Sequence, residues 1–243
     1  MVLKEILNFC VLLFIMGRVV ASNMILTPEK AVIIEDSAVI ADLHLGFENV
    51  LQNKGVAIPR IQVREIVKNV KKIVDKYNLN QIIVAGDLKH EFSKNLPYEW
   101  EDIREFIESL DVELEVVRGN HDNFLATILA EYNIELKEYV RIGDYYVIHG
   151  HRDAEYERLI MGHEHPAIKV RIRGATYTFP CYLLVDNTKI VLPAFSPLMR
   201  GSDVLQNSYL SPILRKAKKI EVFAIEEEVV YLGSIEDLKR VIV

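Results

Sequence analysis

Five apolar segments of this chain end in the same way, and this pattern restricts the possible folds more than any other feature of the sequence. Each segment has the composition of a buried strand and is followed at once by aspartate, asparagine or histidine, usually beside a glycine. In chain order, the polar groups are Asp42-Leu43-His44, Gly86-Asp87, Gly119-Asn120-His121-Asp122, His149-Gly150-His151 and Gly162-His163-Glu164-His165. In α/β sheets the carboxyl ends of parallel strands meet at one edge, so we expect these side chains to converge.

A segment with helical periodicity lies between the first two of these strands. Apolar residues recur at helical spacing over 59–78, and Pro59 suits the first turn of that helix. Further helices are predicted over 98–110 and 122–132. These βα units alternate in the manner typical of a layered α/β protein.

The second half of the chain is richer in short strands. From Leu159 onward, apolar runs of strand length follow one another, and the chain ends in a predicted helix with Ser234 as N-cap and Asp237 at the capping-box position. Together, the two halves predict an α/β fold in four layers, an αββα sandwich with two mixed sheets face to face and helices outside.

The first 23 residues are predicted to be an apolar extension. Residues 24–243 are predicted to form a single domain, because no Pro-, Gly- or Ser-rich linker divides them. The apolar run Ile6–Gly17 resembles a signal-peptide core, but Lys4 and Glu5 cancel and leave no positive flank. The run is also too short to span a bilayer as a helix. A buried element, or a segment upstream of a native start at Met16 or Met24, remains an alternative.

Charge and cysteine content favour a cytoplasmic protein without stable membrane association. The formal net charge of −6 disfavours non-specific binding to nucleic acid or acidic membranes. Local basic clusters at 171–173 and 214–219 are expected to be solvated faces. Cys10 and Cys181 cannot build a disulfide framework, which fits a reducing compartment.

The side chains at the strand ends have the chemistry of metal ligands. Aspartate, asparagine and histidine offer hard-to-borderline oxygen and nitrogen donors, and there are enough of them for two ions. Asp42 and His44 would point to one side by strand alternation, and Asp87 has two carboxylate oxygens with which to bridge two cations. A single Gly-Asp is usually a turn and a lone histidine is usually structural, but five such groups in order favour a functional site.

These five groups together resemble the motifs of the calcineurin-like metallophosphoesterase superfamily, over Ala38 to about Pro166. Further phrases resemble archaeal SbcD-related and bacterial DNA-ligase-associated phosphoesterases and extend the likeness to about Gly201: "ADLHLGFE", "GDLKHEF", "RGNHD", "GHEHPAI" and "LPAFSPL". About forty residues follow, too few for the DNA-binding domain and the ATPase-gripping segment of SbcD-type nucleases.

The resemblance implies a role for each residue. One metal would be held by Asp42, His44, Asp87 and His165, and the other by Asp87, Asn120, His149 and His163. Mn²⁺ is the expected ion, with Zn²⁺, Fe²⁺, Ni²⁺ or Mg²⁺ as alternatives. A metal-bridging hydroxide would be the nucleophile, and His121 would protonate the leaving oxygen.

Other residues are weaker candidates. His90 matches the Gly-Asp-Leu-x-His of SbcD-type nucleases and favours phosphodiester chemistry, although it could instead cap a loop. Lys89, Arg118 and Arg200 are candidate substrate contacts that could equally be solvated, and Ser196 belongs to the same apolar loop as Arg200.

The resulting hypothesis is a dinuclear metal-dependent phosphodiesterase acting on nucleic acid or nucleotide-like substrates such as DNA, RNA or cyclic nucleotides. Partners in DNA repair would follow from the resemblance alone. A phosphomonoesterase of the same superfamily is the main alternative. A non-catalytic binding scaffold would be expected to lack some of the ligands, and the sequence leaves the oligomeric state open.

Overall fold

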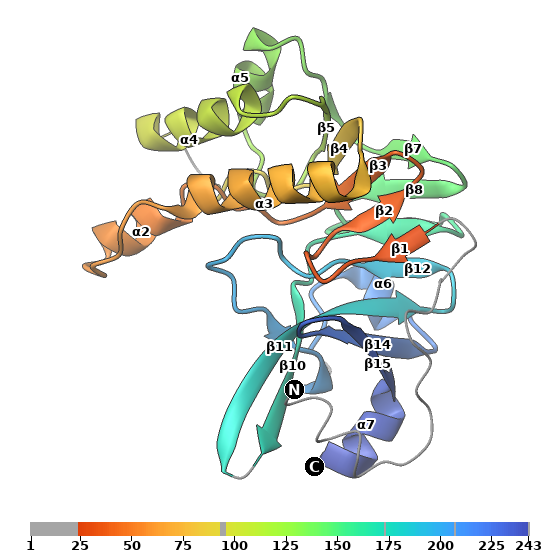
Figure 1. Ribbon diagram of the computed structural model, residues 1–243. Helices are drawn as coiled ribbons and strands as arrows, with labels where there is room; N and C mark the ends of the chain where they lie inside the picture. Colours follow the sequence, from red (N-terminus) through yellow and green to blue (C-terminus); the bar gives the residue numbers. More distant parts are fainter. Residues whose placement is uncertain (1–23, 93–95, 173, 207, 243) are drawn as a thin grey trace.

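The computed structural model describes residues 24–92, 96–172, 174–206 and 208–242. Two sheets lie face to face, and helices cover the outer face of each (Figure 1). The predicted α/β sandwich with two mixed sheets is therefore confirmed. The predicted extension over 1–23 lies outside the described residues.

The first sheet contains the strands β1 (Met24–Leu26), β2 (Val32–Ile34), β3 (Ser37–Ile40), β4 (Gln81–Val84), β5 (Glu113–Val117) and β6 (Leu136–Lys137), in that order. The strands from β3 to β6 run parallel, whereas β1, β2 and β3 pair antiparallel. The parallel strands are connected through helices α2 (Phe47–Asn53), α3 (Gln62–Tyr77), α4 (Pro97–Glu108) and α5 (Leu125–Glu131). Because β3, β4 and β5 are parallel, their carboxyl ends lie along one edge.

The second sheet begins with β7 (Val140–Ile142), β8 (Tyr145–Ile148), β9 (Leu159–Met161), β10 (Pro166–Ile172) and β11 (Ala175–Val185). It continues with β12 (Lys189–Val191), β13 (Ser202–Asp203), β14 (Ile220–Ile225) and β15 (Val229–Ser234). The short helices η1 (Val204–Gln206) and α6 (Pro212–Arg215) and the C-terminal helix α7 (Ile235–Ile242) belong to this half. Strands β8 and β9 are parallel, so their carboxyl ends also share an edge.

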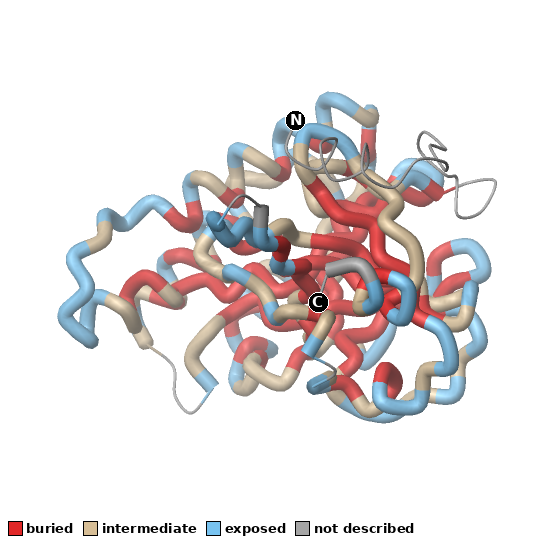
Figure 2. Tube along the Cα trace, turned by 90° about the horizontal axis from the view of Figure 1, so that it is seen from below, coloured by how far each residue is buried: buried red, intermediate tan, exposed pale blue. Residues whose placement is uncertain are grey.

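Alternation along the strands divides the core into three parts. In β4, Ile82 and Val84 face the helices of the first half, whereas Ile83 faces the second sheet. Ile83 meets Val147 and Ile160 of that sheet in the cluster between the layers. Figure 2 shows the buried stretches running through the centre of the molecule, with exposed segments at its periphery.

Helix α3 begins later than predicted, at Gln62, so Pro59 lies before the helix rather than in its first turn. The reason is a non-local cap, because Oε2 of the buried Glu48 accepts hydrogen bonds from the backbone N–H groups of Ile61 (2.9 Å) and Gln62 (3.0 Å). The predicted cap of α7 is confirmed, since the Asp237 N–H donates to Ser234 Oγ at 3.2 Å. None of the described helices has the length and apolar character needed to cross a bilayer.

Candidate metal centre

The five polar groups converge where the carboxyl ends of both sheets meet. All seven histidines of the chain lie in this region, and ring pairs with centroids 4.9–6.1 Å apart join them into two clusters. The first cluster contains His44, His90, His121 and His165. The second contains His149, His151 and His163.

The first group of donor atoms comes from Asp42, His44 and His165. Nε2 of His165 lies 3.2 Å from Oδ1 of Asp42 and 3.2 Å from Nε2 of His44. Oδ2 of Asp87 lies 3.8 Å from the same His44 nitrogen. The donor atoms of Asp42, His44 and His165 lie within 4.8 Å of one another, close enough to share one cation.

The second group surrounds Nε2 of His149. That nitrogen lies 3.1 Å from Oδ1 of Asn120, 3.2 Å from Nδ1 of His163 and 3.3 Å from Oδ2 of Asp87. Asp87 Oδ2 therefore borders both groups, and each group draws its donors from loops of both sheets.

The spacing and chemistry of these atoms fit divalent cations. Two ligands about 2.1 Å from one cation and about 90° apart lie about 3 Å from each other, close to the separations seen here. Nδ1 of His149 lies 3.0 Å from the backbone carbonyl of Ala85, which can only accept, so Nδ1 carries a proton and Nε2 is the nitrogen that a metal would bind after displacing the second proton.

The electrostatics of the metal-free protein keep two of the proposed histidine ligands neutral, as metal binding requires. Burial lowers the pKa of His44 to about 3 and that of His163 to about 4, which keeps both imidazoles neutral. Burial opposes a charge on His149, but the Asp87 carboxylate outweighs it and raises the pKa of His149 to about 9. The protonated His149 then supplies positive charge among the carboxylates, where a cation would otherwise do so.

The loops that carry the donors have unusual backbone geometry. Five of the predicted ligands are non-glycine residues at positive φ: Asp42 (59°), His44 (47°), Asp87 (53°), His163 (71°) and His165 (48°). The prediction that strand alternation would align Asp42 and His44 is therefore wrong. Strand β3 ends at Ile40, and the left-handed turns after it direct the two side chains together. Such conformations persist where surrounding structure enforces them, and they concentrate at functional sites.

Two glycines make room for this arrangement. A Cβ atom on Gly119 would lie 2.1 Å from Oδ1 of Asp87, and one on Gly86 would lie 2.5 Å from Nδ1 of His149. No side chain fits at either position without moving a donor residue.

Asp122 is a supporting residue to which the sequence analysis gave no role. Its buried carboxylate accepts hydrogen bonds from the backbone N–H groups of Gly119 (2.7 Å), Asp87 (2.8 Å) and Lys89 (3.3 Å). It thereby ties the loop after β5 to the loop after β4. The sequence signal for this supporting role was the position of Asp122 at the end of the Gly-Asn-His-Asp motif.

Glu164 supports the loop after β9. As expected, it points away from the donors: its carboxylate accepts from the backbone N–H groups of Leu210 (3.0 and 3.1 Å) and Ser211 (2.9 Å). The short loop between His163 and His165 is thus fixed to the start of α6.

Gln62 supports the loop after β3, and no local sequence signal indicated this. Its Nε2 donates to the backbone carbonyls of His44 (2.9 Å) and Leu43 (3.2 Å) and to Ser196 Oγ (3.1 Å). Ser196 is fully buried and serves here as an acceptor that supports the loop.

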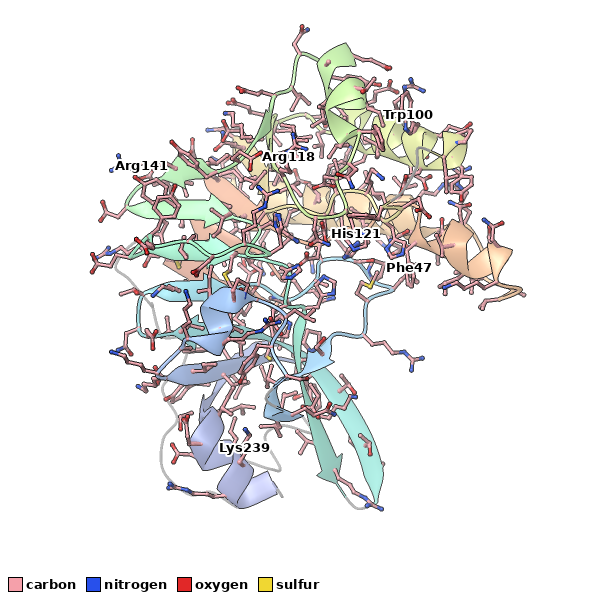
Figure 3. The ribbon with its side chains drawn as sticks, turned by 180° about the vertical axis from the view of Figure 1, so that it is seen from behind. Phe47, Trp100, Arg118, His121, Arg141 and Lys239 are labelled. Atoms are coloured by element: carbon pink, nitrogen blue, oxygen red, sulfur yellow. The ribbon has the colours of Figure 1, made fainter. Side chains whose placement is uncertain are left out.

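His121 and His90 lie at the edge of the first group. Nδ1 of His121 donates to the backbone carbonyl of His90 at 2.5 Å, and the His121 N–H donates to Asp87 Oδ1 at 2.9 Å. Nδ1 of His90 lies 3.4 Å from Nδ1 of His44, and burial lowers the pKa of His90 to about 4. Figure 3 shows His121 in the middle of the molecule, where the two halves meet.

The three candidate substrate contacts differ in their surroundings. The prediction that Lys89 contacts substrate is wrong. Its side chain is fully buried and its Nζ lies 3.5 Å from Glu99 Oε2, so the ammonium is not available to a phosphate. Arg118 is partly exposed, and its Nε donates to Glu138 Oε1 at 3.0 Å. Arg200 is exposed in the loop between β12 and β13.

The two-sheet fold and its aspartate and histidine clusters define a metal-dependent phosphoesterase. A family model for calcineurin-like phosphoesterases matches residues 37–212, and the chain belongs to that family. A dinuclear metal site is typical of this family, and the two donor groups agree with it.

The fold is shared with a solved structure. The structure resembles that of the nuclease MPE from Pseudomonas putida, with a TM-score of 0.61 and 21% identity, covering 86% of this chain and 94% of that chain. Yfce, a phosphoesterase from E. coli, gives a TM-score of 0.39 and 13% identity, covering 77% of this chain and 87% of that chain. No curated protein sequence matches this chain significantly.

Proposed function

We propose that this protein is a dinuclear metal-dependent phosphodiesterase that hydrolyses nucleic acid or nucleotide-like diesters. The observation that carries the proposal is the position of Asp87 Oδ2, 3.8 Å from His44 Nε2 and 3.3 Å from His149 Nε2, between two groups of donors. The motif that ends in His90 and the likeness to a nuclease support a diester substrate. A relationship to SbcD-related or DNA-ligase-associated enzymes, with partners in DNA repair and a cytoplasmic location, belongs to the same proposal.

The proposed ligands of the first ion are Asp42, His44, Asp87 and His165, and those of the second are Asp87, Asn120, His149 and His163. Mn²⁺ is the proposed ion, with Zn²⁺, Fe²⁺, Ni²⁺ or Mg²⁺ as alternatives that the mixed oxygen and nitrogen donor set also accepts. When bound, such a pair of ions supplies Lewis-acid stabilisation of the phosphate oxygens and lowers the pKa of a water molecule.

His121 is the proposed general acid. Because its Nδ1 donates to the His90 carbonyl, the imidazole is held in one orientation, and Nε2 is the nitrogen that can exchange a proton with substrate. Its ring centroid lies 5.1 Å from that of His44, which places it beside the first group of donors. It is therefore positioned to protonate the oxygen that leaves phosphorus. His90 positions His121 through its carbonyl and His44 through its ring.

Metal-reconstituted activity on matched ester substrates tests the proposal. The protein is stripped with a chelator, reloaded with Mn²⁺, and assayed with bis-p-nitrophenyl phosphate, p-nitrophenyl phosphate, linear DNA, RNA and 2′,3′-cyclic nucleotides. We expect metal-dependent hydrolysis of diesters to exceed that of the monoester. Faster monoester hydrolysis would make the protein a phosphomonoesterase, and no hydrolysis by fully loaded protein would indicate a non-catalytic scaffold.

A further inference from the structure

A recess of about 150 Å³ adjoins the metal centre at His149. Besides His149 it is lined by Arg118, Tyr139, His151, Arg152 and Tyr156, among others. The proposed hydrolysis of a simple diester assigns no role to most of these residues. The recess therefore shares His149 with the second group of donors.

Tyrosines form one part of the recess. The rings of Tyr146 and Tyr156 are stacked, with centroids 4.1 Å apart and planes 10° apart, and Tyr139 packs against both at 5.6 and 6.1 Å. The Arg141 guanidinium lies 5.9 Å from the ring of Tyr146. Tyr139 remains 49% exposed. The recess thus has aromatic surface open to a ligand.

Two arginines form another part, and they converge on one carboxylate. Oε1 of Glu138 accepts a hydrogen bond from Nε of Arg118 at 3.0 Å, and Oε2 forms an ion pair with a terminal nitrogen of Arg152 at 3.7 Å. The arginine side chains are 33% and 72% exposed, so each keeps donors for a further anion. Asp153, the other acid of the lining, is paired with Lys216.

His151 adds an unsatisfied polar atom. Its Nδ1 is buried and has no hydrogen-bond partner among the described residues. Its ring lies 5.3 Å from that of His149, between the recess and the second group of donors. Buried polar atoms are rarely left without a partner, and an ordered water molecule or an ion beside the second group of donors would satisfy this one.

We infer that the recess binds the nucleotide next to the scissile phosphate, so that the substrate is a polynucleotide rather than a small diester. Arg118 and Arg152 would hold the neighbouring phosphate, and Tyr139 and Tyr156 would stack on its base. Stacking on aromatic side chains accepts any base, so this site selects for chain length rather than sequence. The inference rests on the proposed phosphodiesterase function.

The test compares a substrate that reaches the recess with one that does not. The Mn²⁺-loaded protein is assayed on a single-stranded DNA oligonucleotide and on bis-p-nitrophenyl phosphate, and the ratio of the two kcat/KM values is determined. For Tyr139→Ala and for Arg152→Ala we expect this ratio to fall about tenfold, mainly through KM of the oligonucleotide. Glu138→Gln should change it in the opposite direction, because it removes the carboxylate that competes with phosphate for the two arginines.

Matched controls come from the hairpin of β10 and β11, which projects from the body in Figure 1. Tyr177 is 40% exposed there and Arg171 is also exposed. Tyr177→Ala and Arg171→Ala should leave the ratio unchanged. An abasic oligonucleotide separates the two contacts: it should abolish the effect of Tyr139→Ala and keep that of Arg152→Ala.

The outcomes separate the inference from the proposed function. If the wild-type protein cleaves DNA and the recess variants keep the ratio, or if only the hairpin variants lower it, the inference is wrong while the phosphodiesterase proposal stands. If the loaded wild-type protein hydrolyses no diester, the proposed function fails and the inference fails with it.

Discussion

Oδ2 of Asp87 lies 3.3 Å from Nε2 of His149, so a carboxylate of the first sheet meets an imidazole of the second. The same oxygen is 3.8 Å from Nε2 of His44. A single atom therefore stands between the two groups of donors, and its charge affects both.

Asp87→Asn should weaken the binding of both ions, because the amide removes the shared negative charge while preserving the shape of the side chain. Metal content after dialysis, measured by atomic spectroscopy, should fall below two ions per chain. Asp75→Asn, on the exposed face of α3, is the matched control and should retain the wild-type content. Two tightly held ions in the Asp87 variant would refute the bridge.

His121→Ala should keep both ions and lose most of the diesterase activity. The residue is not among the proposed ligands, and general acid catalysis is typically worth about 10²–10⁴-fold in rate. Metal analysis and kcat on an oligonucleotide, measured on the same preparation, check the two halves of this prediction. Normal turnover, or loss of an ion, would remove His121 from its assigned role.

Gly119→Ala should disturb Asp87 and with it the metal centre, because the new Cβ would lie 2.1 Å from Asp87 Oδ1 and 2.3 Å from its backbone nitrogen. Overpacking of this kind costs about 1–3 kcal/mol of unfolding free energy, measurable by urea denaturation. The control is Gly55→Ala, which also puts a side chain at a positive φ (84°) but has no atom beyond its own chain neighbours within 4 Å of the new Cβ. This variant should leave metal affinity unchanged. Full metal affinity in the Gly119 variant would show that the loop adapts easily.

Glu164→Gln should loosen the loop between His163 and His165. Oε2 of the carboxylate accepts from Leu210 and Ser211, and Oε1 also accepts from Leu210. In the amide both hydrogen bonds lose their charge assistance, and the NH2 group that replaces Oε1 faces the Leu210 N–H, donor against donor. We expect a loss of about 1–3 kcal/mol in unfolding free energy together with weaker metal binding. Glu155→Gln, at an exposed position, should change neither quantity. An unaltered urea midpoint would mean that these hydrogen bonds do not hold the loop.

The convergence of the donor residues could be predicted from sequence because it depends on a regular rule. Apolar runs identify the strands, and the residue after each run lies at a known edge of the sheet. The φ angles of His44 and Asp87 could not be predicted in this way, since they depend on contacts with distant residues such as Gln62 and Asp122.

Long side chains were the least predictable part of the site. Lys89 follows Asp87 by two residues, yet its ammonium turns inward to Glu99 of α4, a residue ten positions away whose burial the local pattern did not indicate. The start of α3 was misplaced for a similar reason, because its cap is Glu48 of another helix. By contrast, the cap at Ser234 involves only neighbours in the chain and was predicted correctly.

The order of the strands bears on when the centre can be assembled in the cell. Among the described residues, the strands of the first sheet span 24–137 and those of the second span 140–234. With the proposed ligands, neither ion has its full set on one side of that boundary. A nascent chain leaving the ribosome would therefore expose Asp42, Asp87 and Asn120 well before His163 and His165 emerge. Metal capture is then a late event of biosynthesis, and truncated translation products would remain metal-poor and inactive.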